Sequence, residues 1–314
     1  MNGDIQDELC AVFLGLVSIT GIVFNAISAV VLIRNTVFKN AFGMLTTLHT
    51  MANIGVLSIF LLWSCPLMLL GLSPRLAGLN KNIGQLSLFF QEIAFHACFF
   101  ISVNRLLAIT TPAFYRNKFT RSVAGFLIIF VCSLSALYVS IYFYGDCGFY
   151  FNVDLFTFQF SSNECGNRLS LYIDLIYNCS LFGVMGSMDL VTLSMLIKTK
   201  KRLSLHTGTK QSIREARFFF QAVINSLVYC LMLISFDVIA PRTKRPLALF
   251  FWTTGTWAIG HTCGGLILAI FNREISRLFV HPRHFVTWIF DSRSANSIPN
   301  NATQPSPNDN ISTF

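Results

Sequence analysis

Ionisable side chains are rare inside the long apolar runs of this sequence, and one of them, Arg105, carries a permanent charge. It stands near the end of an apolar run that begins around Ile83. A guanidinium presents five N–H donors that hydrocarbon cannot satisfy. Arg105 is therefore expected either to extend to a membrane–water interface or to dock between neighbouring helices, where its chemistry is charge recognition.

Glu92 and His96 are a second candidate for chemistry, because they stand four residues apart in the same run. At helical spacing they share one face, so they can meet each other or a partner on the fourth or fifth apolar run. An ionisable pair inside a membrane is a functional hypothesis by default. A hydrogen-bonded structural pair with Glu92 protonated is an equal alternative. Arg105 lies on a different face of this helix, which it shares at helical spacing with Cys98, Gln91 and Ser87. This face is expected to point toward the interior of the bundle.

Four titratable residues within the apolar runs are of types that bind metal ions, as a membrane-embedded metal hydrolase would require: His49, His96, Asp189 and His261. None of the histidines has the His-x-x-x-His spacing that places two metal ligands on one helical face. Polar groups that bond between packed helices are the better interpretation, and Asn25 and Asn53 are interpreted in the same way. No catalytic residue, metal or cofactor is predicted.

The chain that carries these residues is far too apolar for a soluble domain, since 54% of its 314 residues are hydrophobic and 12% are charged. A helix needs about 20 apolar residues to cross a bilayer. Seven runs meet this length: Leu9–Ile33, Gly43–Leu70, Ile83–Ile109, Val123–Tyr144, Leu169–Ile197, Phe218–Ala240 and Leu247–Phe271. The expected fold is an all-α membrane protein, a bundle of seven transmembrane helices over residues 9–271.

Basic residues are divided unequally between the two ends of such a bundle. Counted with Arg105, the first, third and fifth loops and the C-terminal segment hold 17 Lys and Arg residues, against six elsewhere. The positive-inside rule predicts an extracellular N-terminus, residues 1–8, and a cytoplasmic C-terminus. Residues 1–8 lack the basic start of a secretory signal. Because basic surfaces beside lipid attract anionic headgroups, the net charge of +9 indicates a bilayer partner and no nucleic-acid partner.

The segment after the seventh run changes character twice. Residues 272–289 combine basic and aromatic side chains, which predicts a short amphipathic eighth helix on the inner leaflet. Residues 290–314 are rich in Ser, Asn, Thr and Pro without periodicity, so a disordered cytoplasmic tail is expected.

Cys147 and Cys165 are the only cysteines in a loop that the topology puts outside the cell. That compartment is oxidising, and a disulfide between them would close a flexible loop and stabilise the protein by about 3 kcal/mol. Cys10, at the outer edge of the first run, is the one competing partner.

The spacing around Arg105 carries a family resemblance. Asn104, Arg105, Pro112 and Tyr115, with Ala-Ile between them, resemble the Asp-Arg-Tyr…Ala-Ile…Pro…Tyr signature of rhodopsin-like G-protein-coupled receptors. Nearly the whole chain is similar to nematode chemoreceptors, most like serpentine receptor class X. The resemblance implies a plasma-membrane receptor for a small molecule or peptide that activates a heterotrimeric G protein, with these four residues at the coupling site.

Receptors of this kind bind ligands in the outer half of the bundle. The pocket is expected to combine polar and aromatic side chains from several runs: Ser87, Gln91, Glu92, Asp174, Asp237, Trp252 and Trp257. Their apolar surroundings favour a small, largely apolar ligand with few polar groups.

The chain departs from the family pattern at several positions. Asn104 replaces the acid and Leu106 the Tyr of the signature, so the resting contact of the Arg should be weaker. Asn53 replaces the acid that binds sodium. The sixth run lacks Cys-Trp-x-Pro, and the seventh has Gly264-Gly265 in place of Asn-Pro-x-x-Tyr, which offers flexibility or close packing instead. The seventh run has no Lys that retinal would require.

A membrane transporter or ligand-gated channel is the other class to weigh. It would be indicated by an internal repeat or a row of intramembrane charges, and neither is visible in the sequence. The basic loop over residues 198–217 suits both a lipid-attracted face and a G-protein contact. A receptor is therefore the prediction.

Overall fold

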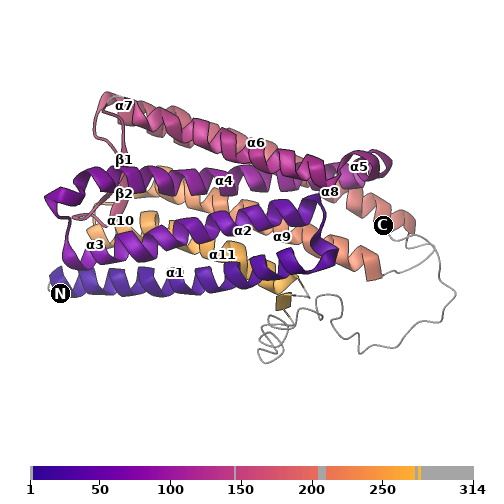
Figure 1. The fold of residues 1–314 in the computed structure, drawn as a ribbon, viewed down its shortest axis with the longest axis horizontal. Coiled ribbons are helices and arrows are strands. Elements are labelled where there is room, and N and C mark those ends of the chain that lie inside the picture. The colour runs from indigo at the N-terminus through magenta and orange to yellow at the C-terminus, as the bar shows by residue number, and fades with distance from the viewer. Residues whose placement is uncertain (1–2, 145, 204–209, 273–274, 277–314) are drawn as a thin grey trace.

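The computed structural model describes residues 3–144, 146–203, 210–272 and 275–276. Within these ranges, seven apolar helices are long enough to cross a membrane, from Ile5–Arg34 to Pro246–Phe271. They lie side by side in one elongated bundle (Figure 1). The predicted all-α bundle of seven transmembrane spans is thereby confirmed.

The two ends of the bundle differ. The N-terminus and both β-strands lie at one end, called the hairpin end below, and the short helix α5 (Pro112–Lys118) lies at the other, called the Arg105 end (Figure 1). The spans are built from α1 (Gly3–Arg34), α2 (Ala41–Ile59) with α3 (Cys65–Leu70), α4 (Ala77–Thr110), α6 (Arg121–Ser140), α7 (Glu164–Arg168) with α8 (Tyr177–Leu203), α9 (Lys210–Leu233), and α10 (Pro246–Phe250) with α11 (Thr256–Phe271). Single 3₁₀ turns lie at Thr36–Phe38, Pro74–Leu76, Ile141–Phe143 and Ala240–Arg242.

Several helices begin earlier than the apolar runs predicted. The third span starts its α-helix at Ala77, ahead of Ile83, and the sixth at Lys210, ahead of Phe218. Hydropathy marks only the part of a helix that lies in hydrocarbon, whereas the helix continues into the polar interface. The start of α2 is instead fixed by an N-cap. Asn40 Oδ1 accepts a hydrogen bond from the backbone N–H of Gly43 at 2.9 Å.

Four stretches of the spans are π-helical, with hydrogen bonds that reach five residues back. They are Phe60–Ser64, Leu169–Ile176, Ile234–Ile239 and Phe251–Gly255. Two of them come just before a proline, whose ring clashes with the carbonyl four residues earlier and is relieved by a wider turn. The sequence indicated none of the four widened stretches, because apolar composition continues through them.

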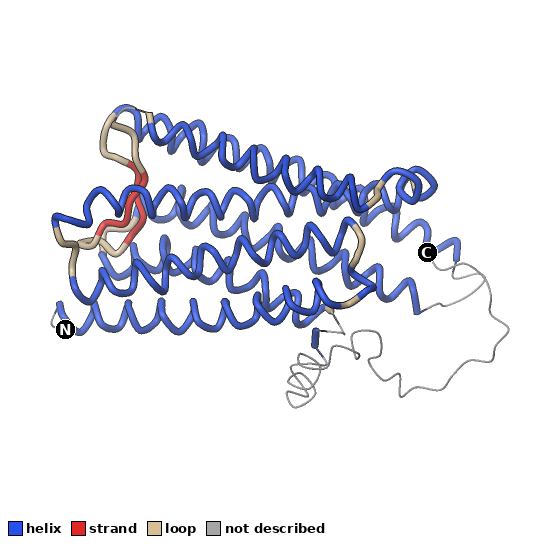
Figure 2. Tube along the Cα trace, viewed as in Figure 1, coloured by secondary structure: helices blue, strands red, loops and turns tan. Residues whose placement is uncertain are grey.

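The loop between the fourth and fifth spans forms an antiparallel hairpin at this end of the bundle (Figure 2). Its strands are β1 (Phe149–Asn152) and β2 (Thr157–Phe160), with Phe151 opposite Phe158. The rings of Phe149, Phe151 and Phe158 are at most 2% exposed. The expectation of a flexible loop is wrong for this segment, because alternate aromatic side chains anchor it in the core.

Covalent and polar contacts fix the hairpin on both sides. Cys147, just before β1, forms a disulfide with Cys165 in α7, whereas Cys10 is free and buried. On α4, Asn80 Nδ2 donates to the carbonyl of Phe151 at 2.8 Å. The hairpin is thus tied to the third and fifth spans at once.

The paired glycines of the seventh span serve close packing. A Cβ at Gly265 would lie 2.7 Å from the backbone nitrogen of Asn25 on α1, and one at Gly264 would lie 2.4 Å from Nδ2 of Asn53 on α2. Contacts this short leave no room for a side chain. Close packing, one of the two roles considered for these glycines, is therefore the one observed.

The predicted amphipathic helix over 272–289 and the tail over 290–314 lie outside the described residues, apart from Asn272, Ile275 and Ser276. Both remain predictions.

Candidate functional site

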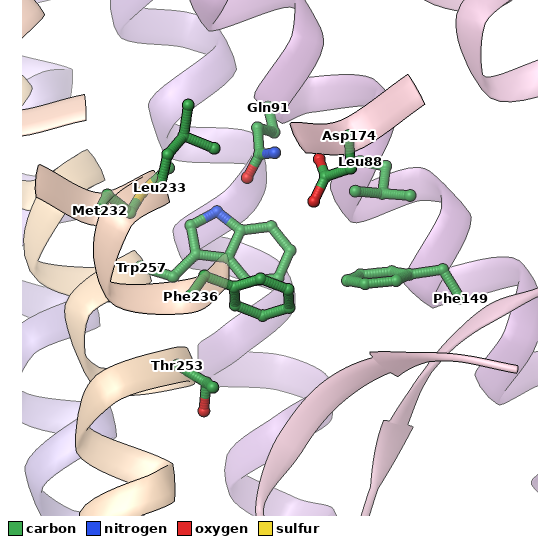
Figure 3. Close-up of a pocket in the computed structure, with 9 residues that line it drawn as sticks. All are labelled: Leu88, Gln91, Phe149, Asp174, Met232, Leu233, Phe236, Thr253 and Trp257. Atoms are coloured by element: carbon green, nitrogen blue, oxygen red, sulfur yellow. The ribbon is translucent and has the colours of Figure 1, made fainter. Parts of the chain in front are cut away.

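A small cavity of about 20 Å³ lies inside the hairpin end of the bundle. Four spans and the hairpin line it: Leu88, Gln91, Phe149, Asp174, Met232, Leu233, Phe236, Thr253 and Trp257 (Figure 3). This volume is far below the ~300–1,000 Å³ found for small-molecule sites, so a ligand of that size requires the side chains of the wall to move apart. Apolar walls with a few convergent polar groups are typical of such sites.

Three lining residues come from the π-helical stretches: Asp174, Phe236 and Thr253. A π turn rotates the side chains that follow it relative to an α-helix. Helical periodicity therefore does not assign these three residues to the cavity, and π-helical turns are frequent at functional sites.

The residues expected in the pocket divide into two groups. Gln91, Asp174 and Trp257 line the cavity. Ser87 is buried but does not line it, because its Oγ donates to the carbonyl of Gly84 at 2.6 Å. Trp252 does not line this cavity and is 42% exposed, so its place in a ligand pocket stays a prediction.

Glu92 and Asp237 lie behind the cavity wall and form an acidic cluster with Asp174. Asn178 joins two of the acids, because its Nδ2 donates to Asp174 Oδ1 at 3.2 Å and to Glu92 Oε1 at 3.4 Å. Asp237 of the sixth span interacts electrostatically with Asp174. Three carboxyl groups from three spans thus converge on one region.

His96 uses the partners on other spans that its spacing allowed. Nδ1 meets Ser135 Oγ on α6 at 3.0 Å, and Nε2 meets the hydroxyl of Tyr177 on α8 at 2.6 Å. Both ring nitrogens are engaged, while Glu92 bonds to Asn178. The two residues therefore serve different contacts and do not act as one pair.

A buried chain of hydrogen bonds leads from the cavity into the middle of the bundle. Trp257 Nε1 donates to His261 Nε2 at 2.9 Å, and His261 Nδ1 lies 2.8 Å from Asn53 Oδ1. The Tyr229 hydroxyl donates to the same oxygen at 3.0 Å, and His49 Nε2 lies 2.8 Å from that hydroxyl. These five residues are called the polar chain below.

One arrangement of hydrogens satisfies every bond of the polar chain. An indole N–H only donates, so His261 accepts at Nε2 and donates from Nδ1 to Asn53. Because Tyr229 also donates to Asn53, its oxygen is free to accept from Nε2–H of His49. Asn53 passes the connection to α1, since its Nδ2 donates to Asn25 Oδ1 at 3.2 Å.

The polar chain ends at a second small cavity, of about 10 Å³, near the Arg105 end. Its lining includes both His49 and Arg105: Thr46, His49, Cys98, Ile101, Ser102, Arg105, Gln221, Ala222, Asn225 and Ser226. The two cavities are thus connected by side chains of α2, α9 and α11.

Arg105 docks between helices and does not extend to the interface. Its side chain is 8% exposed, and its guanidinium carbon lies 5.1 Å from the ring centroid of Phe42. Asp189 on α8 interacts with it electrostatically and accepts a hydrogen bond from Ser226 Oγ at 3.3 Å. The sequence indicated Asp189 only as an interhelical polar group, because nothing in the spacing relates the third span to the fifth.

The residues that follow Arg105 in the signature lie on α5. Pro112 is its first residue, where the missing N–H costs nothing. Tyr115 forms a side-chain hydrogen bond with Asn104, which is itself 2% exposed. Burial raises the pKa of Tyr115, and the bond to Asn104 opposes part of that rise. Within the described part of the chain, no three His, Cys, Asp or Glu side chains are placed to hold a metal ion.

The arrangement of the spans defines a class. The fold is similar to that of squid rhodopsin, with a TM-score of 0.72 over 96% of this chain and 94% of that chain, at 14% sequence identity. The protein is therefore a multi-pass membrane protein with the rhodopsin fold.

Sequence comparison identifies the family within that class. The family model for the serpentine type 7TM GPCR chemoreceptor Srx matches residues 16–272, and the chain belongs to this family of G-protein-coupled receptors. Serpentine receptor class X 45 of Caenorhabditis elegans is 23% identical over 303 residues, which cover 90% of this chain and 84% of that protein.

Proposed function

We propose that this receptor is chemosensory, binds a small ligand in the cavity beside Trp257 and couples to a heterotrimeric G protein at the Arg105 end. The polar chain carries the proposal, because it joins the cavity beside Trp257 to the cavity beside Arg105 through buried hydrogen bonds. The hairpin end then faces the outside of the plasma membrane and the Arg105 end the cytoplasm. The excess of Lys and Arg in loops at the Arg105 end supports this orientation.

Ligand binding changes the bundle through Trp257. A ligand that displaces the indole disturbs its bond to His261, and His261 also holds Asn53. Because Tyr229 on α9 shares the Asn53 oxygen, α9 responds to the position of α11. A ligand shifts such an equilibrium only by its different affinity for the two arrangements.

The same helix α9 closes the cavity around Arg105. Gln221, Asn225 and Ser226 lie on α9 and line that cavity. Displacement of α9 away from α4 would expose the guanidinium and free it from Asp189. A buried cation would then become available to a G-protein segment at the Arg105 end.

Second-messenger output in a heterologous cell that carries a promiscuous G protein tests this proposal. Arg105→Ala should abolish both basal and stimulated output at unchanged surface expression, and Arg105→Lys should reduce it strongly, because an ammonium lacks the planar fork of a guanidinium. Arg168→Ala is the matched control, since Arg168 is exposed and pairs with Glu164 at the hairpin end. Full output from Arg105→Ala would overturn the assigned coupling site.

A further inference from the structure

The cavity beside Trp257 has one ionisable lining residue, Asp174. Its side chain is 4% exposed, and Figure 3 shows the carboxylate directed into the space between Gln91, Phe149 and Trp257. Among the described residues that line the cavity, none is Lys, Arg or His. The one charge that this wall can supply is therefore negative.

The surroundings of Asp174 add two further acids, Glu92 and Asp237, and three uncharged hydrogen-bonding side chains, Asn178, Tyr138 and Gln91. The two N–H groups of the Asn178 amide are shared between Asp174 and Glu92. Within the described residues, Glu92 Oε2 and Asp237 Oδ2 are buried without a hydrogen-bond partner, and Glu92 is fully buried. Buried carboxylates require a compensating cation or donor.

The remaining polar side chains of the lining, Gln91 and Thr253, carry no positive charge. The Thr253 hydroxyl donates to the carbonyl of Leu249 at 2.7 Å, so its hydrogen is already used. The other walls are the rings of Phe149, Phe236 and Trp257 together with aliphatic side chains. Aromatic faces attract ammonium groups, and apolar walls favour an organic body over a hydrated metal ion.

We propose that the ligand is a small organic ammonium ion whose nitrogen pairs with Asp174 and whose apolar body lies between Phe149, Phe236 and Trp257. This inference rests on the proposed function, because it assigns the ligand class of the same cavity. An anionic ligand would meet three carboxyl groups, whereas an ammonium ligand supplies the cation that the lining of this cavity lacks.

Thermal unfolding of the purified full-length receptor tests the ligand class without any signalling. The probes are four ammonium compounds with phenylethyl, indolylethyl, cyclohexylethyl and hexyl skeletons, each compared with the alcohol and the carboxylate of the same skeleton. We expect ammonium members to raise the unfolding temperature and to bind at least about 30-fold more weakly to Asp174→Asn. Asp154→Asn is the matched control, because it removes an exposed carboxylate from the hairpin without touching the cavity.

The other outcomes of this experiment also decide whether the ligand is an ammonium ion. Ammonium compounds that stabilise no better than the alcohols, or that bind equally well to Asp174→Asn, overturn the inference. Equal stabilisation by sodium chloride alone does the same. Asp174→Glu keeps the charge and should retain most of the effect, which separates charge recognition from a folding defect in Asp174→Asn.

The test also separates this inference from the proposed function. Ammonium binding that depends on Asp174 but produces no G-protein signal would overturn the proposed coupling and leave the ligand class intact. Conversely, G-protein signalling by neutral members alone would overturn the ligand class and leave the receptor function intact.

Discussion

At the scale of single residues, the acid that faces Arg105 comes from another helix. The residue before Arg105 is the neutral Asn104, which bonds to Tyr115, and the electrostatic partner is Asp189 on α8. A restraint between two helices depends on their relative position, whereas a restraint between adjacent residues does not. Separation of α4 from α8 and α9 would therefore release Arg105 directly.

This arrangement predicts opposite effects of two substitutions on ligand-independent signalling. Asp189→Asn removes the restraining charge and should raise basal output about fivefold, which corresponds to ~1 kcal/mol. Asn104→Asp adds an acid beside Arg105 and should lower basal output. Second-messenger assays normalised to surface protein measure both, with Asp154→Asn as the control. Unchanged basal output in Asp189→Asn would refute the restraint.

At the scale of elements, the polar chain requires that α11 lie close against α1 and α2. Gly264 and Gly265 permit that approach, and the side chains of Asn25 and Asn53 occupy the space beside them. His261, one turn before the glycines, then reaches Asn53. The contact between these helices is thus both a packing surface and part of the route between the two cavities.

Gly265→Ala should therefore damage stability and coupling together. The added Cβ would lie 2.7 Å from the backbone nitrogen of Asn25, so α11 must move, at a cost of about 1–3 kcal/mol. Gly125→Ala is the matched control, because nothing lies within 4 Å of a Cβ there and Ala favours a helix by ~1 kcal/mol over Gly. The unfolding temperature in detergent should fall for the first variant and stay or rise for the second. Equal behaviour of the two would contradict the close-packing role.

At the scale of the whole molecule, the division of basic residues predicts the orientation in the membrane. The acceptor sequences Asn301-Ala302-Thr303 and Asn310-Ile311-Ser312 should carry no N-glycan, because the proposed orientation places the C-terminal segment in the cytoplasm. Asp4→Ser creates an acceptor at Asn2 and should be glycosylated. A mobility shift on enzymatic deglycosylation measures both. Glycan on Asn301 or Asn310 would reverse the proposed topology.

Sequence patterns predicted the parts of this molecule that depend on one helix at a time. The seven spans follow from hydropathy, and the inward stripe of the third span follows from helical spacing, since Ser87, Gln91 and Cys98 are all buried. The hairpin was not predicted, because its aromatic rings are buried only through contact with the transmembrane bundle. That contact cannot be inferred from the hairpin sequence alone. Asp174 was expected in the pocket and lines the cavity, whereas Phe236 and Thr253 in π-helical turns and the acid beside Arg105 were not assigned, because π-helical turns and the pairing of spans leave no periodic signal in the sequence.

The anchored hairpin has a consequence for the timing of a response. Its aromatic rings close the end of the bundle above the cavity, and the disulfide and Asn80 hold it in place. At the proposed ligand site, a bound molecule would leave only when the hairpin or the cavity wall moves, so the decay of a signal would follow the rate of that motion as well as the strength of the contacts. A receptor with this property would report the recent average of a stimulus and smooth its rapid fluctuations.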